Sequence, residues 1–271
     1  MSRRNVRISV ILASHGSRGR QVDDLMASIA RELRDEPGVG EVLLAFHQGS
    51  PTFEDVLGLV SGDLALVVPV FMAEGYYTHQ VLRPQILRHP RASELDLWMS
   101  PALGSHDLMR ALLLERCRTI LRTSRWDPHK TAVVILGHGT PRSSSSSLTT
   151  VAAAAELENQ QVSSTVIPAF ISDTPTPQES LEGVNVEQVL IVPFLLGGGL
   201  HAEEVAEICG IESLGYGEEN GLRWIDERGR LYQIDNPIGL NPEITSIIHQ
   251  LVRERTAWIS LESSERLLNV K

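Results

Sequence analysis

The stretch ILASHGS occupies residues 11–17, and a similar stretch, VILGHGT, occupies residues 134–140. In both copies an apolar run ends in a His-Gly dipeptide that is followed by a hydroxyl-bearing residue. A short apolar run that is bounded by glycine is typical of a buried β-strand. Because His138 follows His15 by 123 residues, the sequence predicts a duplicated strand that ends each time in a histidine loop.

Two further landmarks repeat at an offset of 124 residues, and a third repeats after an insertion in the second copy. In the first landmark, Phe46 with SPT at 50–52 matches Phe170 with TPT at 174–176. In the second, VVPVF at 67–71 matches IVPFL at 191–195. In the third, Pro101 and Gly104 match Pro237 and Gly239. Chance does not explain this ordered set, so we infer an internal duplication. The predicted halves are residues 1–125 and 126–271, each of the size of a small domain.

Apolar runs alternate with helical patterns along both halves. The runs predicted to be strands are 8–13, 41–46, 64–71, 132–136, 164–170 and 189–196. Their near-continuous hydrophobicity favours burial on both faces, as in a parallel sheet. We therefore expect an α/β fold of two similar half-domains, each a small parallel β-sheet flanked by helices. The insertion, at about residues 210–236, is predicted to contain a β-hairpin of 222–225 and 231–234.

The composition of the 271 residues is that of a globular protein, with 42% hydrophobic and 21% charged residues. Acidic residues number 34 against 24 lysines and arginines, which argues against a nucleic-acid partner. No apolar run reaches the roughly 18 to 20 residues of a membrane span. Cys117 and Cys209 form no CxxC pair, which disfavours a thiolate zinc site or a disulfide framework. We expect a cytoplasmic protein with no membrane partner.

Each half carries two histidines that follow strands, His15 with His79 and His138 with His201. Loops after the carboxyl ends of parallel strands converge on one crevice, where ligands bind. Neutral imidazole is the commonest ligand of divalent transition metals. A histidine at a strand end can instead be a loop residue that is hydrogen-bonded to the backbone. The same arrangement of histidines occurs in both halves, however, which favours a pair that binds metal.

These residues together resemble the class II tetrapyrrole chelatases of the sirohydrochlorin cobaltochelatase and ferrochelatase type. The resemblance covers residues 7–255 and is carried by the His-Gly loops, the Phe-to-Pro loop after the second strand, and the V-P strand that precedes a glycine-rich turn and a histidine. It implies a lyase of siroheme or cobalamin biosynthesis that inserts Co²⁺ or Fe²⁺ into sirohydrochlorin or a related tetrapyrrole, held in the cleft between the half-domains. The metal is then a substrate, and no organic cofactor is expected.

The resemblance also implies roles for particular residues. His201 lies two residues after Gly199, like the G-x-H element of the family, so His138 and His201 are the first choice for metal binding and catalysis. His15 and His79 are the alternative pair. Family members often place a carboxylate after the second strand; Asp173 can supply it in the second half, and His47 can replace it in the first.

Further residues are assigned on the charge of the substrate. Sirohydrochlorin is rich in carboxylates, and arginine binds carboxylates better than lysine does. We therefore expect Arg18, Arg20 and Arg142 with Ser143 to contact the substrate, although the serine run at 143–147 is equally typical of a plain polar loop.

Glu203 and Glu204 follow His201 directly. They can deliver hydrated metal or accept protons, or they can simply be acidic residues that favour a helix start.

Three functional alternatives stay open. The first is insertion of metal into sirohydrochlorin, the second is ferrochelation of a porphyrin with fewer carboxylates, and the third is a non-catalytic carrier of metal or tetrapyrrole. Two fused half-domains can bury their own interface, which is compatible with a monomer. No GxGxxG, Walker-type or G-x-S-x-G motif follows a predicted strand, which disfavours nucleotide binding and serine hydrolysis.

Overall fold

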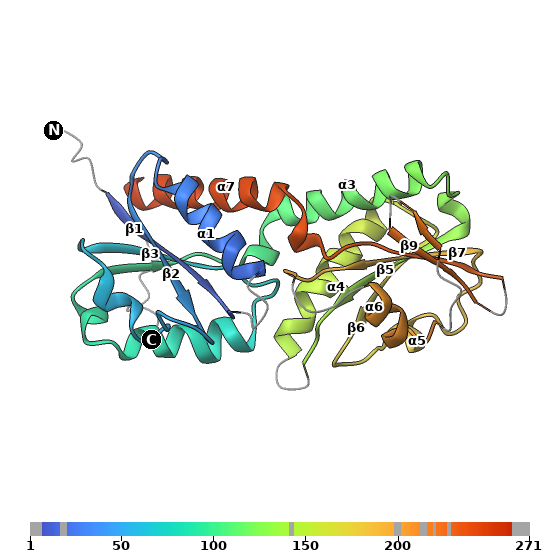
Figure 1. Ribbon diagram of the computed structural model, residues 1–271, viewed down its shortest axis with the longest axis horizontal. Helices are drawn as coiled ribbons and strands as arrows, with labels where there is room; N and C mark the ends of the chain where they lie inside the picture. The colour runs from blue at the N-terminus through green and yellow to red at the C-terminus, as the bar shows by residue number, and fades with distance from the viewer. Residues whose placement is uncertain are drawn as a thin grey trace. The chain divides into compact units, whose positions relative to one another are not determined.

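The computed structural model describes residues 7–16, 21–140, 144–197, 202–211, 216–218, 221–226 and 229–261. Contacts group the chain into two compact units (Figure 1). Unit 1 comprises Met1–His106 and Pro242–Lys271, and unit 2 comprises Asp107–Asn241. Each unit is built on its own β-sheet. No helix in the described part of the chain is long and apolar enough to cross a membrane.

Unit 1 contains a four-stranded parallel sheet in the order β2-β1-β3-β4. Its strands are β1 (Ile8–Ser14), β2 (Val39–Phe46), β3 (Leu64–Pro69) and β4 (Asp96–Met99), and its α-helices are α1 (Gln21–Leu33), α2 (Arg83–Arg88) and α7 (Glu243–Leu261). Helices α1 and α7 contact each other, and Figure 1 shows them over one face of the sheet. Every residue of the central strand β1 is buried, as its nearly continuous apolar sequence predicts.

Unit 2 contains a six-stranded sheet in the order β6-β5-β7-β10-β9-β8. Its strands are β5 (Thr131–Gly137), β6 (Thr165–Phe170), β7 (Gln188–Pro193), β8 (Tyr216–Glu218), β9 (Gly221–Ile225) and β10 (Leu231–Ile234), and its α-helices are α3 (Asp107–Thr123), α4 (Ser144–Asn159), α5 (Pro177–Ser180) and α6 (Ala202–Ile208). Strands β6, β5, β7 and β10 are parallel, whereas β9 runs antiparallel to β10 and to β8. The predicted hairpin of the insertion is therefore confirmed.

All six apolar runs that predicted strands form strands, and the α/β fold is confirmed. Strand β4 was not predicted, because its four residues are too few to show a pattern. Strand β10 takes the place beside β7 that β4 takes beside β3. The two sheets therefore share a four-strand core, and β9 and β8 extend the second one.

The two copies of the repeat also share backbone details. Gly16 and Gly139 both have a positive φ, 76° and 68°. The peptide bonds before Pro51 and Pro175 are both cis. The amide of Phe46 donates to the Pro51 carbonyl at 3.0 Å, and the amide of Phe170 donates to the Pro175 carbonyl at 2.9 Å. The duplicated sequence landmarks thus have the same local conformation in both units.

The last helix of each sequence half belongs to the other unit. Helix α3 lies before the predicted boundary at residues 125/126 yet is part of unit 2, where Arg116 donates to Asp235 at 2.7 and 2.5 Å. Helix α7 ends the second half yet is part of unit 1, where Arg253 donates to Glu36 at 2.7 and 2.6 Å. The halves 1–125 and 126–271 describe the duplication and stay a prediction; the compact units divide the chain elsewhere.

Candidate functional site

Both His-Gly loops turn sharply at the carboxyl end of a central strand. A Cβ atom added at Gly16 would collide with the carbonyl oxygen of Gln48, and one at Gly139 would lie 2.6 Å from Cβ of Asp173. Together with their positive φ, these close approaches require glycine at both places. The glycines let each histidine loop lie directly against the loop that follows the neighbouring strand.

In both loops, one ring nitrogen of the histidine lies within hydrogen-bond distance of a backbone carbonyl oxygen of the same loop. Nδ1 of His15 lies 3.2 Å from the Gly16 carbonyl oxygen, and Nδ1 of His138 lies 3.0 Å from that of Gly139. A carbonyl oxygen only accepts hydrogen bonds, so Nδ1 carries the proton when these bonds form. In the neutral ring the lone pair is then on Nε2, where it can bind a metal ion or accept a proton.

In unit 2 the histidine loop lies beside a carboxylate. His138 is exposed, and its carbonyl oxygen accepts a bond of 2.8 Å from the amide of Ser172. The next residue, Asp173, accepts bonds of 2.9 Å from the amide of Thr174 and from Oγ of Ser147. These bonds, that from Thr174 first, hold the pKa of Asp173 below its ordinary value. The two adjacent loops therefore bring an accessible imidazole and an ionised carboxylate to the same edge of the sheet.

Several residues assigned from the sequence have no described position. His201, Arg18, Arg20, Arg142 and Ser143 lie outside the described residues. Glu203 lies in α6, but its side chain is outside the described part of the structure, whereas Glu204 is exposed in the first turn of the same helix.

In unit 1 the histidine loop lies among aromatic rings. The ring centroid of His15 is 5.3 Å from that of His47 and 4.7 Å from that of Tyr77, and His47 and Tyr77 are 5.4 Å apart. Burial, helped by the neighbouring charge of His15, lowers the pKa of His47. Nδ1 of His47 is buried and has no hydrogen-bond partner among the described residues. The residue expected to replace the family carboxylate thus does lie next to His15.

His79 meets a different partner. Its Nε2 lies 3.2 Å from Oε2 of Glu74, whose other oxygen accepts a hydrogen bond from the amide of Ala102. His79 lies in a π-helical turn, Tyr76–Leu82, and such turns are frequent at functional sites. Sequence reasoning missed Glu74, because nothing in its spacing from His79 shows that an irregular turn brings the two side chains together.

The described donors occur in pairs. Within the ranges that the structure describes, no group of three or more histidine, cysteine, aspartate or glutamate side chains is arranged to hold a metal ion. One pair, His15 with His47, offers imidazole nitrogens, and the other, His79 with Glu74, offers an imidazole nitrogen and a carboxylate oxygen. First-row transition metals accept both kinds of donor. A pair leaves coordination positions open for water or for the nitrogens of another ligand.

The model of the CbiX protein family matches residues 9–120 and 132–255, once in each half of the chain. The chain belongs to the CbiX family. The match confirms the resemblance to class II tetrapyrrole chelatases. The chain is also 27% identical over 198 residues to a probable sirohydrochlorin cobaltochelatase of Halobacterium salinarum. That alignment covers 65% of this chain and 66%, less than two thirds, of the relative.

Solved structures of CbiX-type proteins share the fold. SirB from Bacillus subtilis with Fe³⁺ matches with a TM-score of 0.71 at 17% identity, over 93% of this chain and 96% of that one. CbiX, the terminal enzyme for siroheme biosynthesis in denitrifying bacteria, matches with a TM-score of 0.67 at 18% identity, over 92% and 99% of the two chains. These TM-scores establish a common fold.

Proposed function

We propose that this protein is a metal chelatase, a lyase that inserts Co²⁺ or Fe²⁺ into sirohydrochlorin or a related tetrapyrrole of siroheme or cobalamin biosynthesis. The observation that carries the proposal is the placement of His138 beside Asp173 at the carboxyl edge of the sheet of unit 2. Membership of the CbiX family and the similarity to a probable sirohydrochlorin cobaltochelatase support the substrate class. The proposal includes a cytoplasmic, monomeric protein without nucleic-acid or membrane partners and without an organic cofactor.

Insertion requires a metal donor and a proton acceptor on the same side of the macrocycle. Two pyrrole N–H protons must leave as the metal enters, so a base has to face the ring. One imidazole nitrogen cannot bind metal and accept a proton at once, so two kinds of group are needed. In the proposed site His138 and His201 present the metal through imidazole nitrogens, and the ionised Asp173 takes up protons.

The remaining assigned residues complete the proposed site. Arg18, Arg20, Arg142 and Ser143 bind the carboxylates of the tetrapyrrole, and Glu203 and Glu204 deliver hydrated metal or accept protons. Arginine suits this task, because its guanidinium forms two parallel hydrogen bonds with one carboxylate.

An alternative site lies in unit 1, with His15 and His79 as the pair. The surroundings of His15 support this alternative, because a second imidazole, that of His47, has its ring centroid 5.3 Å from that of His15. The lowered pKa of His47 keeps that ring neutral and able to bind metal at neutral pH.

Absorbance-monitored insertion of Co²⁺ and Fe²⁺ into sirohydrochlorin tests both assignments. We expect His138→Ala and His201→Ala to lower the rate by about 100-fold or more, the scale of a lost acid–base group, and His15→Ala and His79→Ala to change it by less than about threefold. The reverse pattern would move the site to unit 1. Tight binding of metal or tetrapyrrole without insertion by the wild type would replace the chelatase with a carrier.

A further inference from the structure

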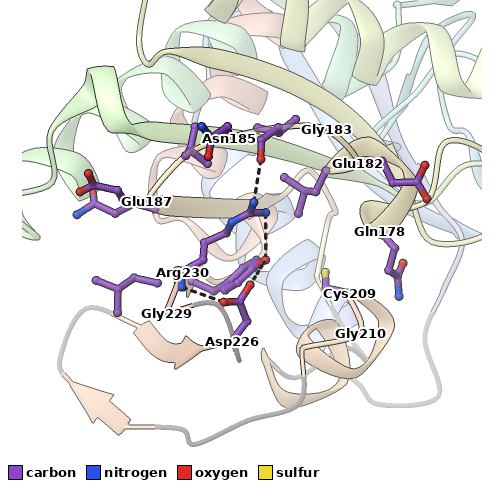
Figure 2. Close-up of a pocket in the computed structure, with 16 residues that line it drawn as sticks. Gln178, Glu182, Gly183, Asn185, Glu187, Cys209, Gly210, Asp226, Gly229 and Arg230 are labelled. Carbon is purple, nitrogen blue, oxygen red and sulfur yellow. Dashed lines mark hydrogen bonds between the residues drawn. The ribbon is translucent and has the colours of Figure 1, made fainter.

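The insertion of unit 2 forms one wall of a cavity of about 970 Å³. This volume is within the range of roughly 300–1,000 Å³ that is usual for small-molecule sites. The other walls are the loop at residues 181–187 and the two residues that follow α6, Cys209 and Gly210 (Figure 2). Nothing in the proposed chelatase mechanism uses this cavity.

The cavity lies at the edge of the sheet opposite the histidine loop. Gln188 and Leu231, which line it, are the first residues of β7 and β10, whereas His138 follows the last residue of β5. Parallel strands all point the same way, and the seven residues of β5 span roughly 20 Å at about 3.3 Å per residue. The cavity is therefore separate from the loops that handle metal.

Arg230 is held in place at the centre of the cavity lining. Its Nη2 donates to the Val184 carbonyl at 2.8 Å, and its Nη1 donates to the hydroxyl of Tyr232 at 3.5 Å (Figure 2). The backbone amide of Arg230 donates to Asp226 at 2.8 Å, and the Tyr232 hydroxyl donates to the same carboxylate at 3.3 Å. These bonds use two of the five guanidinium N–H groups, and the described residues offer no partner to the others.

Arg230 is the one basic residue among the described residues that line the cavity, whose acidic residues are Glu182, Glu187 and Asp226. Figure 2 shows Glu182 and Glu187 on opposite sides of Arg230, with their carboxylates turned away from it. Glu187 is paired with Lys130 at 2.8 Å, and Asp226 already accepts the bonds from Arg230 and Tyr232. The guanidinium of Arg230 is therefore the group of this lining that can bind an anion through its charge.

We propose that this cavity binds a small organic carboxylate, a free di- or tricarboxylic acid, with Arg230 as its anchor. The planar guanidinium offers parallel N–H groups that match a carboxylate, and its existing bonds orient it before the ligand arrives. Amide side chains of the lining, such as Asn185, can bond to further polar groups of the ligand. Because the β9–β10 turn supplies Arg230, the site belongs to the second half of the duplication alone. This proposal is independent of the chelatase assignment.

Calorimetric titration of the full-length protein with succinate tests the proposal. We expect saturable binding by the wild type and binding at least about tenfold weaker in Arg230→Gln, as for the loss of a hydrogen-bonded charge. Arg122→Gln is the matched control, because Arg122 is an exposed arginine of the same unit that does not line the cavity; it should bind within about twofold of wild type, as surface changes usually do. Putrescine, a diamine, serves as the probe of opposite charge.

Arg230→Gln also loses the hydrogen bond to the Val184 carbonyl, so this variant can lose binding because it folds less well. A second variant distinguishes a folding defect from the loss of the binding site. Asn185→Trp leaves all bonds of Arg230 in place and puts a large side chain into the cavity from an exposed position. Thermal unfolding establishes that each variant is folded. Loss of succinate binding in Asn185→Trp supports the site. Absence of binding by the wild type, wild-type affinity in both variants, or binding of putrescine in place of succinate overturns the proposal.

Discussion

The carboxyl edges of the two sheets have the same backbone but different chemistry. The amide of His47 donates to the Ser14 carbonyl at 3.0 Å, and that of Ile171, its counterpart, donates to the Gly137 carbonyl at 3.1 Å. Unit 1 nevertheless places an imidazole there, while unit 2 places a carboxylate two residues later, at Asp173. A duplicated loop can thus keep its hydrogen bonds while single side chains decide which metal ligands and bases it offers.

The largest effects are expected when both histidine loops are disturbed in the same way. Gly139→Ala and Gly16→Ala each add a methyl group where φ is positive and a neighbour is too close. We expect both to lower the free energy of unfolding by about 1–3 kcal/mol through strain. We expect Gly139→Ala alone to lower metal insertion by about 100-fold, because it displaces the reacting groups.

Gly183→Ala is the control for strain without collision, because Gly183 also has a positive φ but no atom within 4 Å of the added Cβ. It should keep the insertion rate of wild type. Equal loss of insertion in Gly16→Ala and Gly139→Ala would show that both loops serve the reaction.

Helix α7 is anchored in unit 1 by the hydrogen bonds of Arg253 to Glu36. Glu36, whose side chain is 6% exposed, bonds to His249 at 2.6 Å and to Arg253, and the bond from Arg253 lowers its pKa to about 2. We expect Glu36→Gln to reduce the free energy of unfolding at pH 7 by about 2 kcal/mol, the scale of a charged hydrogen bond. Denaturant titration measures it, with the more exposed Glu32→Gln as control.

This anchor also has a defined pH dependence. The pKa of Glu36 is depressed in the folded state, so its stabilisation is present above the ordinary value of 4.5 and is lost as the pH falls towards 2. The difference between wild type and Glu36→Gln should therefore shrink across that interval. A difference that does not change down to pH 2 would contradict the ion-pair origin of the effect.

The side chains that distinguish the two edges give a smaller effect. Asp173→Asn removes the proposed proton acceptor while keeping its size, and we expect it to slow insertion by about tenfold or more. His47→Gln, at the corresponding loop of unit 1, should slow it by less than about threefold. The rate of Co²⁺ insertion measures both, and a larger loss in His47→Gln would favour the unit 1 site.

The smallest effect concerns the pKa of His47. Burial is the main cause of its lowered pKa, and the charge of His15 is the lesser one. In an NMR titration His15→Ala should therefore raise the pKa of His47 only part of the way to its ordinary value. Full recovery of the ordinary pKa would mean that charge, not burial, keeps this ring neutral.

Much of the fold could be predicted because its signals are local. The apolar runs of β1 and β5 and the turn residues between β9 and β10 each lie within a few neighbouring positions. Strand β4 was missed because it is short and lies beside β3, more than 25 residues away in the chain. The pairing of Glu74 with His79 was missed because an irregular turn, which leaves no periodic pattern, creates it.

The duplication, the buried strands and the two His-Gly loops can be predicted from the amino-acid sequence, because hydrophobic periodicity and the demand for glycine at a positive φ act on adjacent residues. Three features follow only from the tertiary structure. The ring of His15 lies next to that of His47, Asp173 lies against the loop of His138, and α3 and α7 each belong to the compact unit of the other sequence half. These contacts depend on which strands become neighbours in a parallel sheet and on which apolar surface a helix covers. Both choices are made between segments far apart in the chain, where no local pattern records them.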